Sequence, residues 1–102
     1  MEKTNAQTLL DKLTGNLKDS VKVDVEGVEF TFIRDNSAYD QMMNDITTDN
    51  KVTPIKDYLL AIVAREQKED LLAIINVPGL AGLLAGKVNE VLVPKINITV
   101  KN

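Results

Sequence analysis

Residues 53–93 read TPIKDYLLAIVAREQKEDLLAIINVPGLAGLLAGKVNEVLV and contain more than half of the aliphatic side chains in the chain. Thr53 and Pro54 predict a helix start, because a threonine hydroxyl can cap a free amide and proline at the first helical position loses no hydrogen bond. The apolar residues that follow recur on one helical face. These residues are Ile55, Tyr58, Leu59, Ile62 and Val63. We expect this helix at the centre of the core.

The apolar face shifts by about half a turn after that first helix. At about 100° per residue the face would continue at Glu66, Glu69 and Asp70. The next aliphatic residues are instead Leu71, Leu72, Ile74 and Ile75. Because one straight helix cannot bury both faces against the same partner, the pattern predicts a break within residues 65–68, although neither glycine nor proline marks it.

A third amphipathic helix is predicted after a stop and restart at residues 76–79, and it ends before Pro94. Its apolar residues are Leu80, Leu83, Leu84, Val88, Val91 and Leu92. Gly82 and Gly86 lie inside it, and each costs about 1 kcal/mol relative to alanine in a helix interior. We therefore expect another backbone to pack closely on that side, either within the molecule or from a partner helix.

Two alternating segments flank Glu26-Gly27 and predict a β-hairpin. A two-residue turn pairs Val25 with Val28, Val23 with Phe30 and Val21 with Phe32. All six side chains then lie on one face, which the helices must cover because an isolated hairpin is marginal in water. Residues 95–101 alternate in the same way, so they either join the hairpin as a third strand or remain an extended tail.

Two further short helices are predicted outside the central stretch. Thr4 and Gln7 form a capping-box pattern ahead of a thin leucine stripe, and Gly15 ends that helix. The stripe consists of Leu9, Leu10, Leu13 and Leu17. Asn36 or Ser37 can cap the other helix, in which Tyr39, Met42, Met43 and Ile46 share one face.

The predicted fold class is therefore α+β and mostly helical, with an N-terminal β-hairpin packed on four to five short helices. With 102 residues, 44% of them hydrophobic, the chain suits one core. We expect a single domain over residues 21–102, preceded by a variable extension at residues 1–20 that includes a short helix.

Composition argues against several function classes. The chain has no histidine or cysteine, and neither Ser20 nor Ser37 lies in a motif with an activating base, so we expect no enzyme, cofactor or metal site. A net charge of −3 and only four aromatic residues give no general support for nucleic-acid binding. The polar segment at residues 1–7 is unlike a secretion signal, and no apolar run reaches the roughly 20 residues of a membrane span. The expected location is the cytoplasm.

One segment supports an alternative function. Residues 72–88 resemble a helix-hairpin-helix motif of DNA-binding proteins. The matching residues are Ile75, Pro78, Gly79, Leu80, Ala85 and Val88. Ala81 stands where that family has its second glycine, and Lys87 is the only nearby cation. The alternative is a small nucleic-acid-binding module with a degenerate motif of this kind.

Candidate partner-binding residues fall into two groups. Tyr39, Met42 and Met43 form a soft apolar set on one helix, and methionine surfaces adapt to varied partner helices. Leu80, Gly82, Leu83 and Gly86 form the second group, on the Gly82/Gly86 side of the last helix. Core packing remains an alternative role for both groups.

Several short strings in order carry a family resemblance. They are the hairpin end Glu29-Phe30-Thr31-Phe32, the run from Tyr39-Asp40 to Asn44, Asn50-Lys51-Val52-Thr53-Pro54, Lys68-Glu69-Asp70-Leu71-Leu72, the Pro78-Gly79 break, and Ile96-Asn97-Ile98-Thr99-Val100-Lys101. In this order they resemble the tail assembly chaperones of long-tailed bacteriophages, over about residues 21–102. No single string is specific.

The resemblance implies a protein that binds the phage tape measure protein, keeps its long helical segments soluble, and promotes assembly of the tail tube protein around it. It also implies the host-cell cytoplasm as the location. Because a chaperone needs exposed apolar area, which is unfavourable unless covered, we expect a homo-oligomer.

Overall fold

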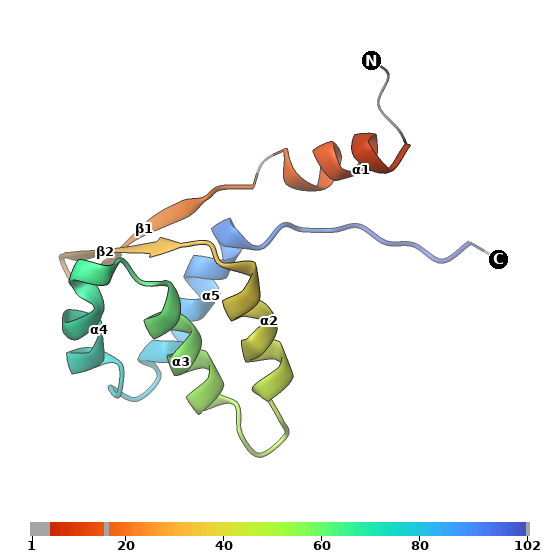
Figure 1. Ribbon diagram of the computed structural model, residues 1–102. Coiled ribbons are helices and arrows are strands. Elements are labelled where there is room, and N and C mark those ends of the chain that lie inside the picture. The colour runs from red at the N-terminus through yellow and green to blue at the C-terminus, as the bar shows by residue number, and fades with distance from the viewer. Residues whose placement is uncertain (1–4, 16, 102) are drawn as a thin grey trace.

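In the computed structural model, which describes residues 5–15 and 17–101, a two-stranded antiparallel hairpin packs on a group of short helices (Figure 1). In chain order the elements are α1 (Asn5–Thr14), β1 (Ser20–Val25), β2 (Val28–Ile33), α2 (Asn36–Asp45), α3 (Val52–Ile62), the 3-10 turn η1 (Arg65–Gln67), α4 (Lys68–Ile74) and α5 (Leu80–Leu92). The prediction of a mostly helical α+β fold with an N-terminal hairpin is confirmed.

The hairpin has the register that its alternation predicts. Val21 lies opposite Phe32, Val23 opposite Phe30, and Val25 opposite Val28. Glu26 and Gly27 both have positive φ, 50° and 92°, as a two-residue turn between twisted strands requires. The Gly27 amide donates to the Asp24 carboxylate at 2.7 Å, which fixes the turn.

The core lies between the hairpin and helices α3, α4 and α5. Its largest fully buried side chains come from all of these elements and are Phe32, Leu59, Leu71, Ile75 and Val88. Helix α3 packs against both α2 and α5, and α5 packs against β1. The expectation that the first helix of residues 53–93 is central is therefore confirmed.

Two predicted helix caps are wrong. Helix α3 begins at Val52 after Lys51, which makes no side-chain cap, so Thr53 is inside the helix. Helix α2 is capped by Asp35 and not by Asn36 or Ser37, because Asp35 has extended φ and ψ and its carboxylate accepts from the Ala38 amide at 3.1 Å. The predicted capping box at Thr4 falls outside the described residues.

The predicted break between the first and second helices of residues 53–93 is present but starts earlier. Helix α3 stops at Ile62, η1 spans the predicted region, and α4 begins at Lys68. The helix stops early because Val63 forms an antiparallel bridge with Phe32, and the Ala64 amide donates to the Thr31 carbonyl at 2.8 Å. Pairing with β2 thus interrupts the helix.

Two arms, α1 and the segment at residues 93–101, project from the same side of the molecule (Figure 1). Helix α1 has no buried residue, and residues 95–101 form an extended tail and not a third strand. The radius of gyration is 16.1 Å, above the roughly 13 Å typical of a 100-residue domain, because of these arms. None of the helices in residues 5–15 and 17–101 is long and apolar enough to cross a membrane.

The glycines of α5 do not mark an internal helix contact. A Cβ atom added at Gly82 or Gly86 would meet nothing within 4 Å, and both residues are exposed. The expectation that another backbone of the same molecule packs there is wrong, because the apolar face of α5 points to α3 and β1 on its other side. The glycine side of α5 is open surface.

Candidate partner-binding surfaces

An open groove separates the turn end of the hairpin from α4 and the start of α5. We call it the hairpin–α4 groove, and its volume is about 580 Å³. Its lining residues are Val25, Glu26, Val28, Phe30, Asp70, Ala73, Ile74, Val77 and Leu80. Seven of these nine side chains are apolar, so the groove offers hydrophobic contact area to a partner.

Local sequence explains both walls of the hairpin–α4 groove. Asp70, Ala73 and Ile74 follow helical spacing and therefore lie on one face of α4, and Val77 lies in the turn that follows. The opposite wall is the inner face of the hairpin near its turn, where Val28 is 55% exposed. Val77 is equally exposed. Two walls from distant parts of the sequence thus leave large aliphatic side chains open to solvent.

Charge at the hairpin–α4 groove has one sign. The ionisable residues in the lining are Glu26 and Asp70, which are both acidic and exposed. An apolar floor with carboxylates at its rim suits an amphipathic helix whose hydrophobic face is flanked by lysine or arginine. The groove therefore combines apolar contact area with two acidic side chains.

The predicted group on α2 is split between surface and core. Met42 is 6% exposed and belongs to the core, whereas Met43 is 55% exposed. Tyr39 is half-buried and meets Tyr58 edge to face, with 6.1 Å between ring centroids and an interplanar angle of 72°. Of the three residues, Met43 presents the most area to a partner.

The predicted group on α5 is mostly exposed. Leu83 is 75% exposed beside the open Gly82 and Gly86, and Leu80 lines the hairpin–α4 groove. Because α3 packs between α2 and α5, the two predicted groups do not form one continuous surface. Sequence reasoning missed the groove residues Val28 and Val77. Both are apolar residues at a turn, and this position could have identified them, because few neighbouring elements cover a side chain there.

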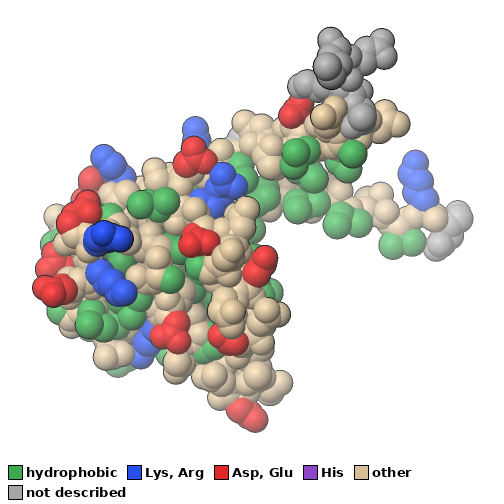
Figure 2. All heavy atoms as spheres, viewed as in Figure 1, with side chains coloured by type: hydrophobic (Ala, Val, Ile, Leu, Met, Phe, Trp, Pro, Cys, Tyr) green, Lys and Arg blue, Asp and Glu red, His purple; other side chains and the backbone are tan. Residues whose placement is uncertain are grey.

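A second depression lies at the base of the arms and has a volume of about 450 Å³. Leu10, Leu13 and Leu17 line it on one side, and Leu92 and Ile96 on another. Hydrophobic side chains continue outward along α1 and the tail, as Figure 2 shows. Leu9 is 55% exposed, Leu10 57% and Ile96 53%. The arms therefore carry uncovered apolar area at a distance from the hairpin–α4 groove.

A hydrogen bond from the buried Tyr58 links α3 to α5. Its hydroxyl donates to the Asn89 side-chain oxygen at 2.8 Å, and the residue is only 4% exposed. Burial, with smaller effects from Tyr39 and Asp35, raises the pKa of Tyr58 to about 12. The phenol is therefore a structural donor at physiological pH.

The turn between α4 and α5 bears on the helix-hairpin-helix alternative. Gly79 adopts a left-handed φ of 83°, and the Leu80 amide already donates to the Val77 carbonyl at 3.1 Å. Lys87 lies 4.0 Å from the Glu90 carboxylate. An engaged amide and a cation beside a carboxylate are less available to a phosphate. Within residues 5–15 and 17–101, no three acidic side chains lie close enough together to hold a metal ion.

Comparisons with known proteins give one family. The model of the phage tail assembly chaperone family matches residues 21–102. A protein of Haemophilus phage HP1 (strain HP1c1), described as an uncharacterised 11.3 kDa protein in the lys 3′ region, is 78% identical over 102 residues that cover both chains completely.

A solved structure of an uncharacterised protein from Bacillus stearothermophilus covers 90% of this chain and 99% of its own, with a TM-score of 0.60 and 21% identity. At that identity the likeness shows the fold alone. The family match over residues 21–102, together with the relative from a phage, shows that this chain belongs to the phage tail assembly chaperone family.

Proposed function

We propose that this protein binds the phage tape measure protein, keeps it soluble, and promotes assembly of the tail tube protein around it in the host-cell cytoplasm. The observation that carries the proposal is the family match over residues 21–102. Tail assembly chaperones are not an enzyme family. The described residues of this chain form apolar surfaces suited to binding a partner.

The hairpin–α4 groove is the proposed site for the client. A tape measure protein with long amphipathic helices needs its apolar faces covered until the tube surrounds it. The groove provides uncovered Val28 and Val77 for such a face, and the carboxylates of Glu26 and Asp70 for flanking cations. Binding should therefore combine apolar burial with a salt-dependent component.

The residues predicted from sequence remain proposed contacts for a client or for a second subunit. They are Tyr39, Met42, Met43, Leu80, Gly82, Leu83 and Gly86. Leu80 adjoins the groove, and the Gly82–Gly86 side of α5 is open for a closely packed helix. Self-association would cover the apolar arms when no client is present, so we propose a homo-oligomer.

Co-expression with the tape measure protein tests the function. We expect its soluble yield to rise with this protein present and a complex to elute in size exclusion. Val28→Asp should weaken capture about tenfold, since burying a valine contributes about 1.5 kcal/mol. Val52→Asp is the matched control, because Val52 is 58% exposed, compared with 55% for Val28, and lies outside the groove lining.

An unchanged yield of soluble tape measure protein would contradict the proposed function. Equal effects of Val28→Asp and Val52→Asp would contradict the groove as the site. Salt-dependent DNA binding that Lys87→Glu abolishes would support the nucleic-acid alternative instead.

A further inference from the structure

The two edges of the hairpin differ in how their outward backbone groups are used. In the observed register, the groups of Val21, Val23 and Val25 face β2, so those of Lys22 and Asp24 face outward. On β2 the outward groups belong to Glu29 and Thr31. Each edge thus presents a short row of donors and acceptors that needs partners.

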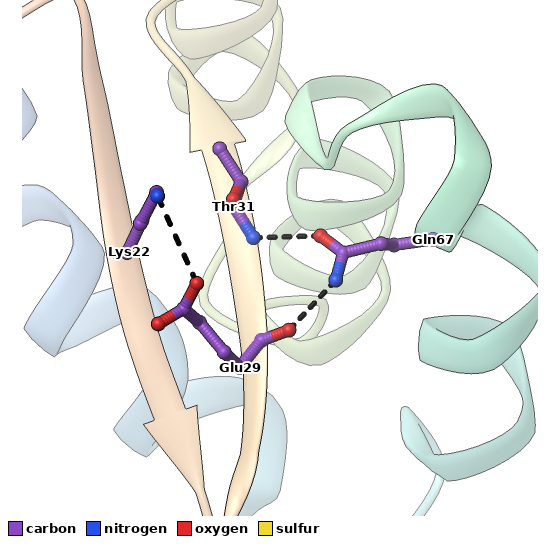
Figure 3. Close-up of polar contacts among 4 residues, drawn as sticks. All are labelled: Lys22, Glu29, Thr31 and Gln67. Carbon is purple, nitrogen blue, oxygen red and sulfur yellow. Dashed lines mark hydrogen bonds and ion pairs between the residues drawn. The ribbon is translucent and has the colours of Figure 1, made fainter.

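The β2 edge is filled by the chain itself (Figure 3). The Ala64 amide donates to the Thr31 carbonyl at 2.8 Å. The Thr31 amide donates to Gln67 Oε1 at 2.7 Å, and Gln67 Nε2 donates to the Glu29 carbonyl at 2.7 Å. A bridge residue and one side-chain amide therefore replace a third strand on this edge.

The β1 edge has no third strand, because the sheet formed by the described residues has only β1 and β2. The Lys22 side chain at this edge is 70% exposed. Open edges pair readily with any extended segment that fits them, so an uncovered edge is a docking position for a strand.

The tail of this chain has the properties of such a strand. Residues 95–101 are extended, and Ile98 and Val100 are 82% and 84% exposed. Seven residues at about 3.3 Å each span about 23 Å, enough to cover the six residues of β1. The segment 93–101 carries two lysines and no acidic residue, whereas residues 21–92 carry twelve acidic and seven basic side chains. Charge therefore favours contact between the tail and an acidic body.

The tail leaves α5 in an extended conformation. Val93, before Pro94, is extended with φ −111° and ψ 122°, as a residue preceding proline prefers. The chain consequently continues away from its own sheet (Figure 1). A strand added outside β1 would turn its apolar face to the same side as Val21 and Val23, where α5 packs against β1.

We propose that residues 95–101 of one copy pair as a third strand with the outer edge of β1 in a second copy of this chain. The pairing would satisfy the outward groups of Lys22 and Asp24 and cover Ile96, Ile98 and Val100. This strand exchange rests on one part of the proposed function, namely that the protein works as a homo-oligomer.

Cysteine cross-linking tests the pairing, because the chain has no cysteine of its own. A tagged Lys22→Cys protein is mixed with untagged Asn97→Cys or Thr99→Cys protein, which covers both registers, and oxidised. The matched control is Glu29→Cys, because Glu29 lies on the neighbouring filled edge and its side chain is 62% exposed, compared with 70% for Lys22. We expect mixed disulfide with Lys22→Cys in at least about tenfold excess over the control.

A second measurement uses the full chain with Ile98→Asp, compared with Val52→Asp. Light scattering should show the mass falling from at least twice the chain mass of 11.3 kDa to the mass of one chain for Ile98→Asp alone. Both sites are exposed, so neither change should unfold the protein.

Three results would overturn the strand exchange. They are equal cross-linking of Lys22→Cys and Glu29→Cys, no mixed disulfide with either tail variant, and, in a further protein that carries both Lys22→Cys and Asn97→Cys, a disulfide that forms only within one chain. The last would place the tail on its own sheet. Co-expression of Ile98→Asp protein with the tape measure protein separates the two proposals. If the monomeric variant still keeps the tape measure protein soluble, the proposed function holds and does not depend on strand exchange.

Discussion

The two strands of the hairpin have similar sequences but different positions in the molecule. On β2, Phe30 and Phe32 are 2% and 0% exposed, and the backbone edge is bonded to Ala64 and Gln67. On β1, the facing Val23 and Val21 are only half-buried, and no further strand pairs with the outer edge among the described residues. The comparison shows that β2 anchors the hairpin to the helices, whereas β1 is held through β2 and α5.

The largest expected effect comes from removing a large buried side chain from β2, the strand that anchors the hairpin. Phe32→Ala should lower the free energy of unfolding by about 3–5 kcal/mol, because it removes a fully buried ring that also supports the bridge to Val63. Its cross-strand partner gives the control. Val21→Ala should cost only about 1 kcal/mol in urea denaturation. Equal losses would contradict the asymmetry.

Removal of the side chain that fills the β2 edge should have an intermediate effect. Gln67→Ala deletes hydrogen bonds to Thr31 and Glu29, and it leaves a half-buried amide without its partner, so we expect a loss of about 2 kcal/mol. Glu66→Ala is the control on the exposed side of η1, with an expected change within about 0.5 kcal/mol. Chemical denaturation of both variants would settle whether the amide stabilises the edge.

A smaller loss is expected at the contact between α3 and α5. Tyr58→Phe keeps the buried ring but removes the bond to Asn89, which should cost about 1 kcal/mol. Because burial raises the pKa of Tyr58 from 10.0 to about 12, the unfolded chain loses this proton first, and stability should fall as pH rises from about 10 to about 12.

Tyr58→Phe should lack this contribution, so the difference in stability between the two proteins should shrink across that interval. Thermal melts at a series of alkaline pH values measure it. A constant difference from pH 8 to pH 12 would show that the phenol does not contribute through its ionisation.

The smallest expected effect is at the open edge. The Lys22 ammonium lies 3.9 Å from the Glu29 carboxylate, and both side chains are mostly exposed, so the pair contributes little. Lys22→Ala should change the free energy of unfolding by less than about 0.5 kcal/mol. A loss of unfolding free energy as large as that of Gln67→Ala would mean that contacts within one molecule already stabilise the outer edge of β1.

Local patterns in the sequence predicted most elements of the fold correctly. Alternation around Glu26-Gly27 predicted the hairpin register, and the shift of the apolar face after Val63 predicted two helices and not one. Helix ends were less predictable. Thr53 was the expected cap but lies inside α3, and Asp35 in place of Asn36 caps α2. A cap depends on the backbone angles of one residue, which neighbouring elements help to set.

Residues at the candidate site were harder to predict. The sequence identified Tyr39, Met42 and Met43 as one apolar set, but it could not distinguish the buried Met42 from the exposed Met43. It also missed the hairpin–α4 groove, whose walls include Val28 and Ile74. Periodicity identifies the face on which a side chain lies but not whether another element covers that face.

The sequence by itself determined the hairpin register and the division of residues 53–93 into three helices, because these follow from local spacing and turn residues. The family followed from the resemblance of several short strings in order, which the family match over residues 21–102 confirms. Only the tertiary structure decided that Val63 ends α3 by pairing with Phe32, that Gln67 fills the β2 edge, and that the tail stays off the sheet. The physical reason is that each of these outcomes depends on competition between distant segments for the same backbone groups.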